Sequence, residues 1–128
     1  MEFQSLLTLI RTEIEHYRKW EIIFSHPLTD LSTSKRRHAV IVSKVNEDKD
    51  DVIVAFISSK IPTEDSETDY IINEDHPDFL DTGLFKKSCF KMDKLLTIEK
   101  SLFTGEIGEV SDRIMKELDE RLRNVLAI

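Results

Sequence analysis

Residues 39–57 read AVIVSKVNEDKDDVIVAFI, which is two apolar runs separated by a polar and charged stretch. The runs at residues 39–43 and 52–57 are short, apolar and rich in β-branched side chains, as buried strands are. The polar residues 46–51 between them suit a turn. Because the two runs lie so close in sequence, we predict that they pair as an antiparallel β-hairpin.

Further strands are predicted on both sides of this hairpin. Residues 20–24 are rich in strand-forming side chains, and residues 70–72 suit a brief strand. Residues 88–92 and 95–98 look like two more strands, separated by a short polar turn. Short strands in hairpin succession that end in a helix predict an α+β architecture, with an antiparallel sheet or small barrel capped by helices.

The last predicted element is an amphipathic helix. It follows a segment that contains Gly105 and Gly108, which we interpret as a connection. Ser111 is a good N-cap, and Asp112 follows it in the first turn. Apolar residues then recur at helical spacing: Ile114, Met115, Leu118, Leu122, Val125 and Leu126.

A second amphipathic helix is predicted at the N-terminus, where the apolar residues also follow a helical stripe. These residues are Phe3, Leu6, Leu7, Ile10 and Ile14. At 128 residues we expect one domain, at residues 20–128, with the helix at residues 1–19 packed on it. The same stripe would also suit pairing with a partner.

Composition suggests a cytoplasmic protein. No apolar run approaches the roughly 20 residues of a membrane span, and the N-terminus lacks the clean apolar stretch of a secretory signal. The only cysteine, Cys89, cannot form an internal disulfide, and we interpret it as a buried small apolar residue.

The net charge of −7 argues against extensive contact with nucleic acid, but the charge is uneven. Residues 62–81 hold eight carboxylates and no Lys or Arg, and we interpret them as a mostly irregular acidic loop. In contrast, Lys35, Arg36 and Arg37 are consecutive. Either a small cationic site lies on an acidic body, or these charges are solvated faces.

Five segments in sequence order carry a family resemblance. Residues 24–43, FSHPLTDLSTSKRRHAVIVS, contain a loop and an apolar strand that ends in Ser, and residues 54–59 read VAFISS. Later segments are Gly83-Leu84 before Ser88, LLTIEK at residues 95–100, and IGEV at residues 107–110. Together they resemble the PemK/MazF-like family of type II toxin–antitoxin systems over roughly residues 20–128.

The resemblance implies an SH3-like antiparallel β-barrel with a C-terminal helix, to which the N-terminal helix would be an addition. It implies a homodimeric toxin and a sequence-selective endoribonuclease that cuts single-stranded RNA without a metal or cofactor. A cognate antitoxin peptide would block it. The family's catalytic Arg falls on Arg37, and the hydroxyl residue of its Ile-Thr-Ser motif falls on Ser58.

Two sites in the sequence depart from the family pattern, one of two residues and one of a single residue. Trp20-Glu21 stands where the family has Gly-Asp before the first strand, and His38 replaces the proline after the key arginine. His38 is a conceivable general base. However, neighbouring residues of a strand point to opposite faces, so His38 is expected to face away if Arg37 faces the site.

The chemistry of RNA cleavage suits Arg37 and Ser58. When the 2′-OH attacks the adjacent phosphate, negative charge grows on the phosphoryl oxygens, and fixed donors stabilise it. Arg37 stays charged and offers a planar fork, while Ser58 can donate one hydrogen bond, with Ser59 as the fallback if the register differs. The alternatives without a catalytic role are that Arg37 is a solvated arginine at a strand edge and that the Ser58 hydroxyl stabilises a turn.

Three further residues are candidates for RNA binding. Lys35 and Arg36 either hold flanking phosphates or form a charged loop surface. Ser88 lies near the RNA groove by resemblance, although a strand hydroxyl paired locally is an equal reading. The four histidines and single cysteine show no metal-binding spacing, so we expect no metal site.

Three classes of function remain open on the sequence. The leading hypothesis is the endoribonuclease toxin. The alternative is a catalytically degenerate PemK/MazF-like binding or regulatory module, which the acidic balance and the departures favour. A purely structural domain is the third. The acidic segment would repel RNA if it lay over the groove, or inhibit the protein by occupying its cationic site.

Overall fold

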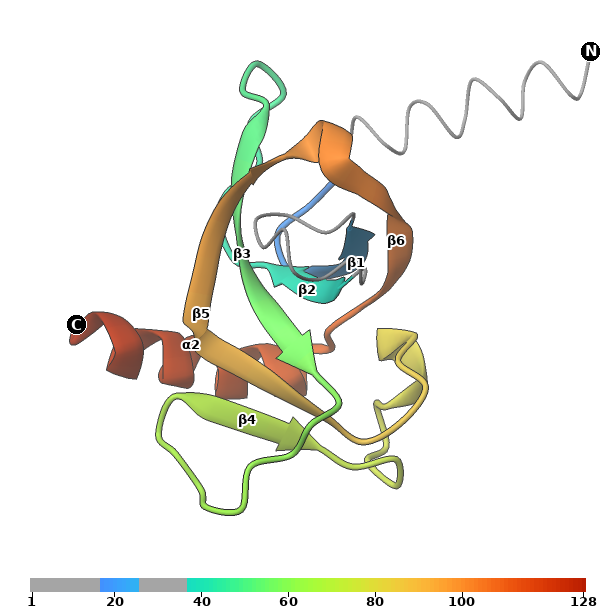
Figure 1. Cartoon of the computed structure of the whole chain (residues 1–128), viewed down its shortest axis with the longest axis vertical. Coiled ribbons are helices and arrows are strands. Elements are labelled where there is room, and N and C mark those ends of the chain that lie inside the picture. The colour runs from blue at the N-terminus through green and yellow to red at the C-terminus, as the bar shows by residue number, and fades with distance from the viewer. Residues whose placement is uncertain (1–16, 26–36) are drawn as a thin grey trace, which may run out of the picture.

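The computed structural model describes residues 17–25 and 37–128, which form a six-stranded antiparallel sheet with a C-terminal helix (Figure 1). The strand order is β4-β5-β3-β2-β1-β6. The strands are β1 (Glu21–Ser25), β2 (Arg37–Ile41), β3 (Asp51–Ser58), β4 (Asp69–Ile72), β5 (Ser88–Glu99) and β6 (Phe103–Glu109). The helices are the 3-10 turns η1 (Leu80–Thr82) and η2 (Lys100–Leu102) and the α-helix α2 (Asp112–Leu126).

The predicted hairpin is confirmed and lies in the middle of the sheet. Strands β2 and β3 pair antiparallel, with Ala39 opposite Phe56 and Ile41 opposite Val54. Successive side chains of a strand alternate between faces. Ala39, Ile41 and Val54 therefore belong to one apolar cluster, while Val40 belongs to the cluster on the other face.

The two strands predicted at residues 88–92 and 95–98 are one continuous strand, so the predicted turn is wrong. The partner in β5 jumps from Leu95, opposite Ala55, to Lys91, opposite Phe56. A bulge accommodates extra residues without ending a strand. The polar pair Asp93 and Lys94 is therefore exposed within β5 rather than in a turn.

The segment around Gly105 and Gly108, interpreted as a connection, is strand β6, which pairs with β1. Gly108 in this strand lets another backbone segment approach closely, and it does not form a turn. A Cβ at Gly108 would lie 2.4 Å from the backbone of Thr82, and one at Gly83 would lie 2.0 Å from the carbonyl oxygen of Ile107. Turn η1 thus rests directly on β6.

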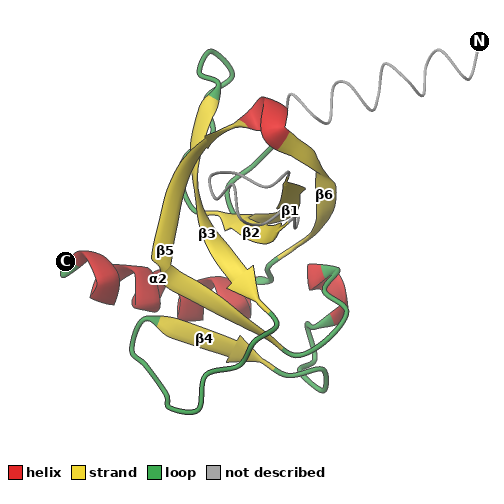
Figure 2. Cartoon of the chain, viewed as in Figure 1, coloured by secondary structure: helices red, strands yellow, loops and turns green. Residues whose placement is uncertain are grey.

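The sheet is open, which corrects the prediction of a closed SH3-like barrel. Strands β4 and β6 are its edges, with no pairing between them in the described ranges. Helix α2 covers the β4 edge: the Arg121 guanidinium donates to the Asp69 carbonyl, and the Asn124 amide donates to the Glu67 carbonyl. Figure 2 shows α2 beside β4 and η1 near β6.

The C-terminal helix is confirmed. The Ser111 hydroxyl accepts a hydrogen bond from the Ile114 amide at 3.3 Å, as its predicted N-cap role requires. Ile114 and Leu118 are fully buried against the sheet. Residues 1–16 of the N-terminal helix predicted at residues 1–19 lie outside the described residues, and the described residues 17–19 are not helical. No helix in the described part is long and apolar enough to cross a membrane.

The acidic segment at residues 62–81 contains strand β4, which confirms the brief strand predicted at residues 70–72, and it runs into turn η1. Asp78 accepts a hydrogen bond from the Ser111 hydroxyl at 2.6 Å and lies 3.7 Å from the Arg113 guanidinium. Phe79 is buried, whereas Leu80 is 89% exposed. The segment is therefore tied to helix α2 at the β4 edge of the sheet.

Trp20, where the family has glycine, keeps the backbone conformation that glycine favours. Its φ is +71°, in the left-handed region, and its side chain is 7% exposed within the core. The Trp20 amide donates to the Ile41 carbonyl, and its carbonyl accepts from the Val110 amide. The indole therefore fills the core at the cost of a strained backbone.

We expect Trp20→Gly to destabilise the protein by about 2–3 kcal/mol, measured by urea unfolding. Glycine relieves about 1–2 kcal/mol of backbone strain, but deleting a buried Trp side chain costs about 3–5 kcal/mol. Leu80→Ala, at an exposed position, should change stability by less than about 0.5 kcal/mol. A more stable Trp20→Gly variant would show that backbone strain outweighs the packing of the indole.

Glu21, next in the sequence, is a buried carboxyl with an unusual titration. Burial raises the pKa of Glu21 to about 7, and a hydrogen bond shared with the Glu106 carboxyl also raises it. The amide and guanidinium of Arg18 act in the opposite direction on this pKa. The Glu21 carboxyl, beside that of Glu106 at the start of β1, therefore holds its proton to a higher pH than a free glutamate does.

This pair should make stability fall as pH rises from about 4.5 to 7. The pKa of Glu21 is higher in the folded state than in the unfolded chain, so the folded state holds the proton longer. The contribution is complete below pH 4.5 and lost above pH 7, and amounts to about 3 kcal/mol. The free energy of unfolding of Glu21→Gln minus that of the wild type should be about 2–3 kcal/mol larger at pH 8 than at pH 4.5.

Urea unfolding across this pH range measures the effect. Glu64→Gln provides the control, because Glu64 is exposed. Its curve should follow that of the wild type. Equal pH dependence in Glu21→Gln and the wild type would mean that Glu21 is not the titrating group.

Candidate functional site

Arg37 and Ser58 are neighbours on one face of the sheet. Arg37 is the first residue of β2, and Ser58 is the last residue of β3. The register pairs His38 with Ile57 and Ala39 with Phe56. One step further along this register brings Arg37 opposite Ser58, where side chains of facing residues are adjacent.

The Arg37 guanidinium is available for a ligand. The residue is exposed, and its Cζ atom lies 6.0 Å from the centroid of the Phe56 ring. Phe56 is half-buried on the same face and supports the side chain from below. Arg37 makes no ion pair with any residue that the structure describes.

The Ser58 hydroxyl has a local role. It accepts a hydrogen bond from the Lys60 amide at 3.0 Å, so it ties down the turn after β3. Its own O–H remains able to donate to a ligand. Ser59, the fallback residue, is exposed beyond the end of β3 and is not part of the face that carries Arg37.

Among the other candidates for RNA binding that the structure describes, Ser88 is not brought to this pair. Ser88 is buried, and its hydroxyl donates to the Lys86 carbonyl at 2.7 Å. Its neighbour Cys89 is the residue opposite Ser58, so Ser88 points to the other face. Lys35 and Arg36 lie outside the described residues.

His38 lies on the opposite face from Arg37, as the alternation of strand residues predicts. Its imidazole stacks on the Phe24 ring, with centroids 4.7 Å apart and planes at 25°. Burial lowers the pKa of His38, which favours the neutral form. The packing explains how a histidine replaces proline after Arg37 without entering the site.

Cys89 is a buried thiol, in agreement with the sequence-based interpretation. Burial is the main factor that raises the pKa of Cys89 to about 11, and the nearby Asp69 carboxylate also raises it. The thiol is therefore protonated and unreactive at neutral pH. No group of three metal-binding side chains occurs in the part of the chain that the structure describes.

Sequence reasoning missed Ser25, the last residue of β1. It pairs with Arg37 across the β1–β2 ladder, so it lies on the same face as Arg37 and Ser58. Ser25 is fully buried, and its Oγ atom has no hydrogen-bond partner. The only signal in the sequence was a serine that follows the apolar residues Ile22–Phe24 at the end of β1.

Lys91 is a second cation on this face, opposite Phe56. Its Nζ atom lies 4.0 Å from a carboxylate oxygen of Asp69, the residue opposite it on β4. The carboxylate offsets the charge of Lys91. Arg37, in contrast, lies beside the Ser58 hydroxyl and has no carboxylate partner among the described residues.

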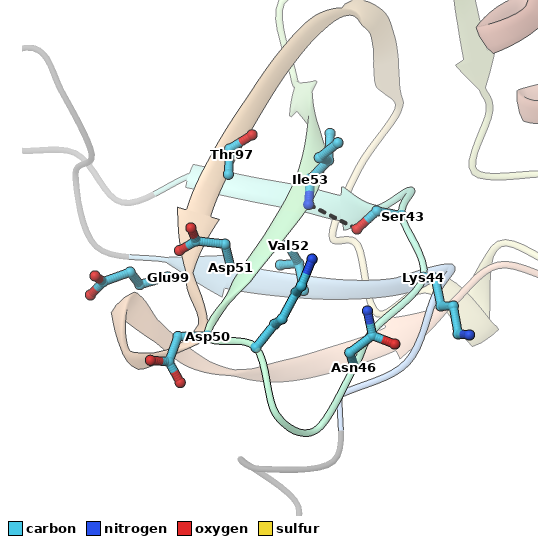
Figure 3. A pocket seen from close by; sticks show the side chains of 10 residues that line it. Ser43, Lys44, Asn46, Asp50, Asp51, Val52, Ile53, Thr97 and Glu99 are labelled. Atoms are coloured by element: carbon cyan, nitrogen blue, oxygen red, sulfur yellow. Dashed lines mark hydrogen bonds between the residues drawn. The ribbon is translucent and has the colours of Figure 1, made fainter.

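A cleft of about 540 Å³ lies at the other end of the β2–β3 hairpin (Figure 3). In it, the Ser43 hydroxyl accepts a hydrogen bond from the Ile53 amide at 2.9 Å. Its lining includes both cations and carboxylates, among them Lys44 and Asp51. Because Arg37 and Ser58 stand at the far end of the same strands, this cleft is not part of their site.

Comparison with known protein families gives a match that covers almost the whole described domain. Residues 19–126 match the sequence profile described as PemK-like, MazF-like toxin of type II toxin-antitoxin system. Comparison with curated protein sequences finds no significant match.

Many solved structures are similar in fold, among them the following three. An endoribonuclease in complex with its cognate antitoxin, from a Mycobacterial species, is 17% identical over 88% of this chain and 97% of its own, with a TM-score of 0.68. The Mycobacterium tuberculosis toxin MazF-mt6 is 19% identical over 84% and 97%, with a TM-score of 0.67. A MazE-MazF structure from Deinococcus radiodurans is 14% identical over 88% and 97%, with a TM-score of 0.66.

Proposed function

The chain belongs to the PemK-like, MazF-like toxins of type II toxin–antitoxin systems, and we propose that it is a sequence-selective endoribonuclease that cuts single-stranded RNA without a metal ion. The observation that carries the proposal is the register of β2 and β3, which places Arg37 opposite Ser58 when it is extended by one residue beyond His38 and Ile57. Arg37 is a cation without an ion-pair partner among the described residues, and Ser58 is a hydroxyl on the neighbouring strand.

The reaction needs no co-reactant. The 2′-oxygen attacks the adjacent phosphorus as the bond from phosphorus to the 5′-oxygen breaks. The products are a 2′,3′-cyclic phosphate and a free 5′-hydroxyl. The 2′-oxygen loses one proton to water and the leaving 5′-oxygen gains one, so the protons balance. The protein has to stabilise the charge on the phosphoryl oxygens.

Arg37 is proposed to supply most of that stabilisation. Its planar guanidinium can donate two parallel hydrogen bonds to phosphoryl oxygens. It can also donate to the leaving oxygen as negative charge forms there. It does not act as a base, because arginine stays protonated in proteins. The Arg37 Cζ atom lies 6.0 Å from the centroid of the Phe56 ring, on the face of the sheet where Ser58 lies.

Ser58 is proposed to position the phosphate. The Lys60 amide fixes the Ser58 oxygen by donating to it, which leaves the hydroxyl proton free to point at the ligand. The proposed partners are single-stranded RNA, a second copy of the chain in a homodimer, and a cognate antitoxin peptide that blocks the site. A similar solved structure is an endoribonuclease with its cognate antitoxin.

A second candidate function is a binding or regulatory module of the same family without cleavage. The net charge of −7 favours it, because extended RNA contacts usually need a basic surface. His38 in place of the family's proline also favours it. In this case the Arg37 face would bind a partner and leave RNA intact.

Incubating the protein with single-stranded RNA in excess EDTA separates the two functions. We expect cleavage by the wild type, a loss of about 10²–10³-fold in rate for Arg37→Ala, and a loss of about tenfold or more for Ser58→Ala. Arg37→Lys should recover only part of the rate, because an ammonium lacks the planar fork. Thermal unfolding of each variant separates loss of chemistry from loss of the turn that Ser58 holds.

Lys44→Ala is the matched control, because Lys44 is an exposed cation at the other end of the hairpin. Its cleavage rate should equal that of the wild type. Full cleavage by Arg37→Ala would mean that the site is elsewhere. RNAs of varied sequence that all stay intact with the wild type would favour the binding module.

A further inference from the structure

Phe85 is the one aromatic residue in the described ranges that lies largely in solvent, with 88% of its surface exposed. Two exposed lysines, Lys86 and Lys87, follow it. Neither lysine forms an ion pair with a residue that the structure describes. A single exposed apolar side chain needs no explanation by itself. An exposed ring beside two unpaired cations, however, is the combination with which proteins bind single-stranded nucleic acid.

The backbone on both sides of Phe85 is fixed. Leu84, before it, is buried, and its amide donates to the Thr82 hydroxyl at 3.1 Å. After it, the Ser88 hydroxyl donates to the Lys86 carbonyl at 2.7 Å. The ring is therefore presented to solvent by an ordered segment, so little backbone entropy would be lost when a ligand binds.

This segment lies at the end of the sheet that carries Ser58. Cys89 of β5 is opposite Ser58 of β3, and Figure 1 shows the start of β5 beside the end of β3. Phe85 precedes Cys89 by four residues, which span at most about 14 Å. Arg37 is one strand beyond Ser58, so its backbone is about 10 Å from that of Cys89. Phe85 therefore lies within about 25 Å of Arg37.

That distance fits a short stretch of single-stranded RNA. Sites for single strands extend over about 4–16 nucleotides. An RNA whose scissile phosphate lies at Arg37 therefore has to contact protein surface beyond Arg37 and Ser58. The segment at the start of β5 offers such a surface on the side of Ser58.

The charges near the segment favour a polyanion over a protein partner. Lys60, which follows Ser58 in the turn after β3, is a third exposed cation without an ion pair among the described residues. One carboxylate is bound to the segment: Glu74 accepts a hydrogen bond from the Lys87 amide at 3.3 Å. Glu74 holds the backbone and offsets part of this charge, and the cations remain in excess.

We propose that Phe85 is a stacking platform for one base of the RNA, and that Lys86 and Lys87 bind the phosphates next to that base. This inference rests on the proposed function and adds to it a contact outside the pair of Arg37 and Ser58. Every base has a π-face, so the platform contributes affinity and leaves selectivity to other contacts. A small cluster of cations beside a ring also explains how an acidic chain can hold RNA.

The test measures binding of a fully 2′-O-methyl RNA of mixed sequence by fluorescence anisotropy. This probe cannot be cut, because its 2′-oxygens are methylated. Phe85→Ala should weaken binding by about 5–100-fold, as loss of one stacked base does. Phe85→Trp should bind as the wild type does, and Phe85→Leu should stay weak because leucine has no π-face. Leu80→Ala is the control, since Leu80 is an equally exposed apolar residue, and its binding should not change.

Two further measurements separate the ring from the lysines. An abasic oligonucleotide of the same length offers phosphates without bases, so Phe85→Ala and the wild type should bind it equally. The double variant of Lys86→Ala and Lys87→Ala should bind it more weakly. In this double variant the slope of log K against log salt should become shallower by about 1.4, for two lost phosphate contacts. In Phe85→Ala the slope should not change.

The outcomes separate this inference from the proposed function. If the wild type cleaves RNA, and Phe85→Ala binds the 2′-O-methyl RNA as the wild type does, the inference is overturned and the nuclease stands. If the wild type cleaves no RNA but binding depends on Phe85, the proposed function fails and the stacking platform stands. Wild-type affinity in Phe85→Leu would indicate an apolar contact and overturn the inference. A change of oligomeric state in Phe85→Ala, seen by sedimentation, would also overturn it, because Phe85 would then lie between two copies of the chain.

Discussion

The pairing register of β2 with β3 is the constraint on which the rest of the structure depends. Side chains alternate along a strand, so a shift of one residue would turn Arg37 to the face where His38 stacks on Phe24. The same shift would exchange the two apolar clusters on either side of the sheet. The register is fixed because Ala39, Val40 and Ile41 are fully buried, so neither face of β2 can be turned to solvent. Core packing thereby sets the position of a guanidinium at the edge of the core.

Sequence patterns predicted the elements that are local. The hairpin and the helix after Ser111 follow from short-range periodicity and a side-chain cap, and both are confirmed. Strand β5 was divided in two because a bulge and a turn share the same polar residues. Strand β6 was missed because Gly108 meets another backbone distant in sequence, and nothing in its neighbours reveals that contact. Barrel closure was overpredicted because α2 and η1 occupy the two edges.

The residues of the candidate site were likewise predicted only in part from the sequence. Arg37 and Ser58 were named from a family pattern, and their position on one face follows from the strand alternation that the sequence already shows. Ser25 could not be named, because a partnerless hydroxyl is defined by what surrounds it and not by its own strand. The site is small and sits on an acidic chain of net charge −7, so its electrostatic attraction is local. Beyond about 8–10 Å, physiological salt largely screens exposed charges.

The attachment of the acidic segment to helix α2 has a consequence for how a polyanion arrives. Carboxylates on a mobile tail would be distributed around the molecule, but Asp78 is anchored to Ser111, and Asp69 lies within β4. Asp69 and Asp78 are therefore held at fixed positions beside α2, and β5 separates β4 from the strand that carries Ser58. A nucleic acid strand that approaches this edge would meet fixed carboxylates, which repel its phosphates before any contact forms.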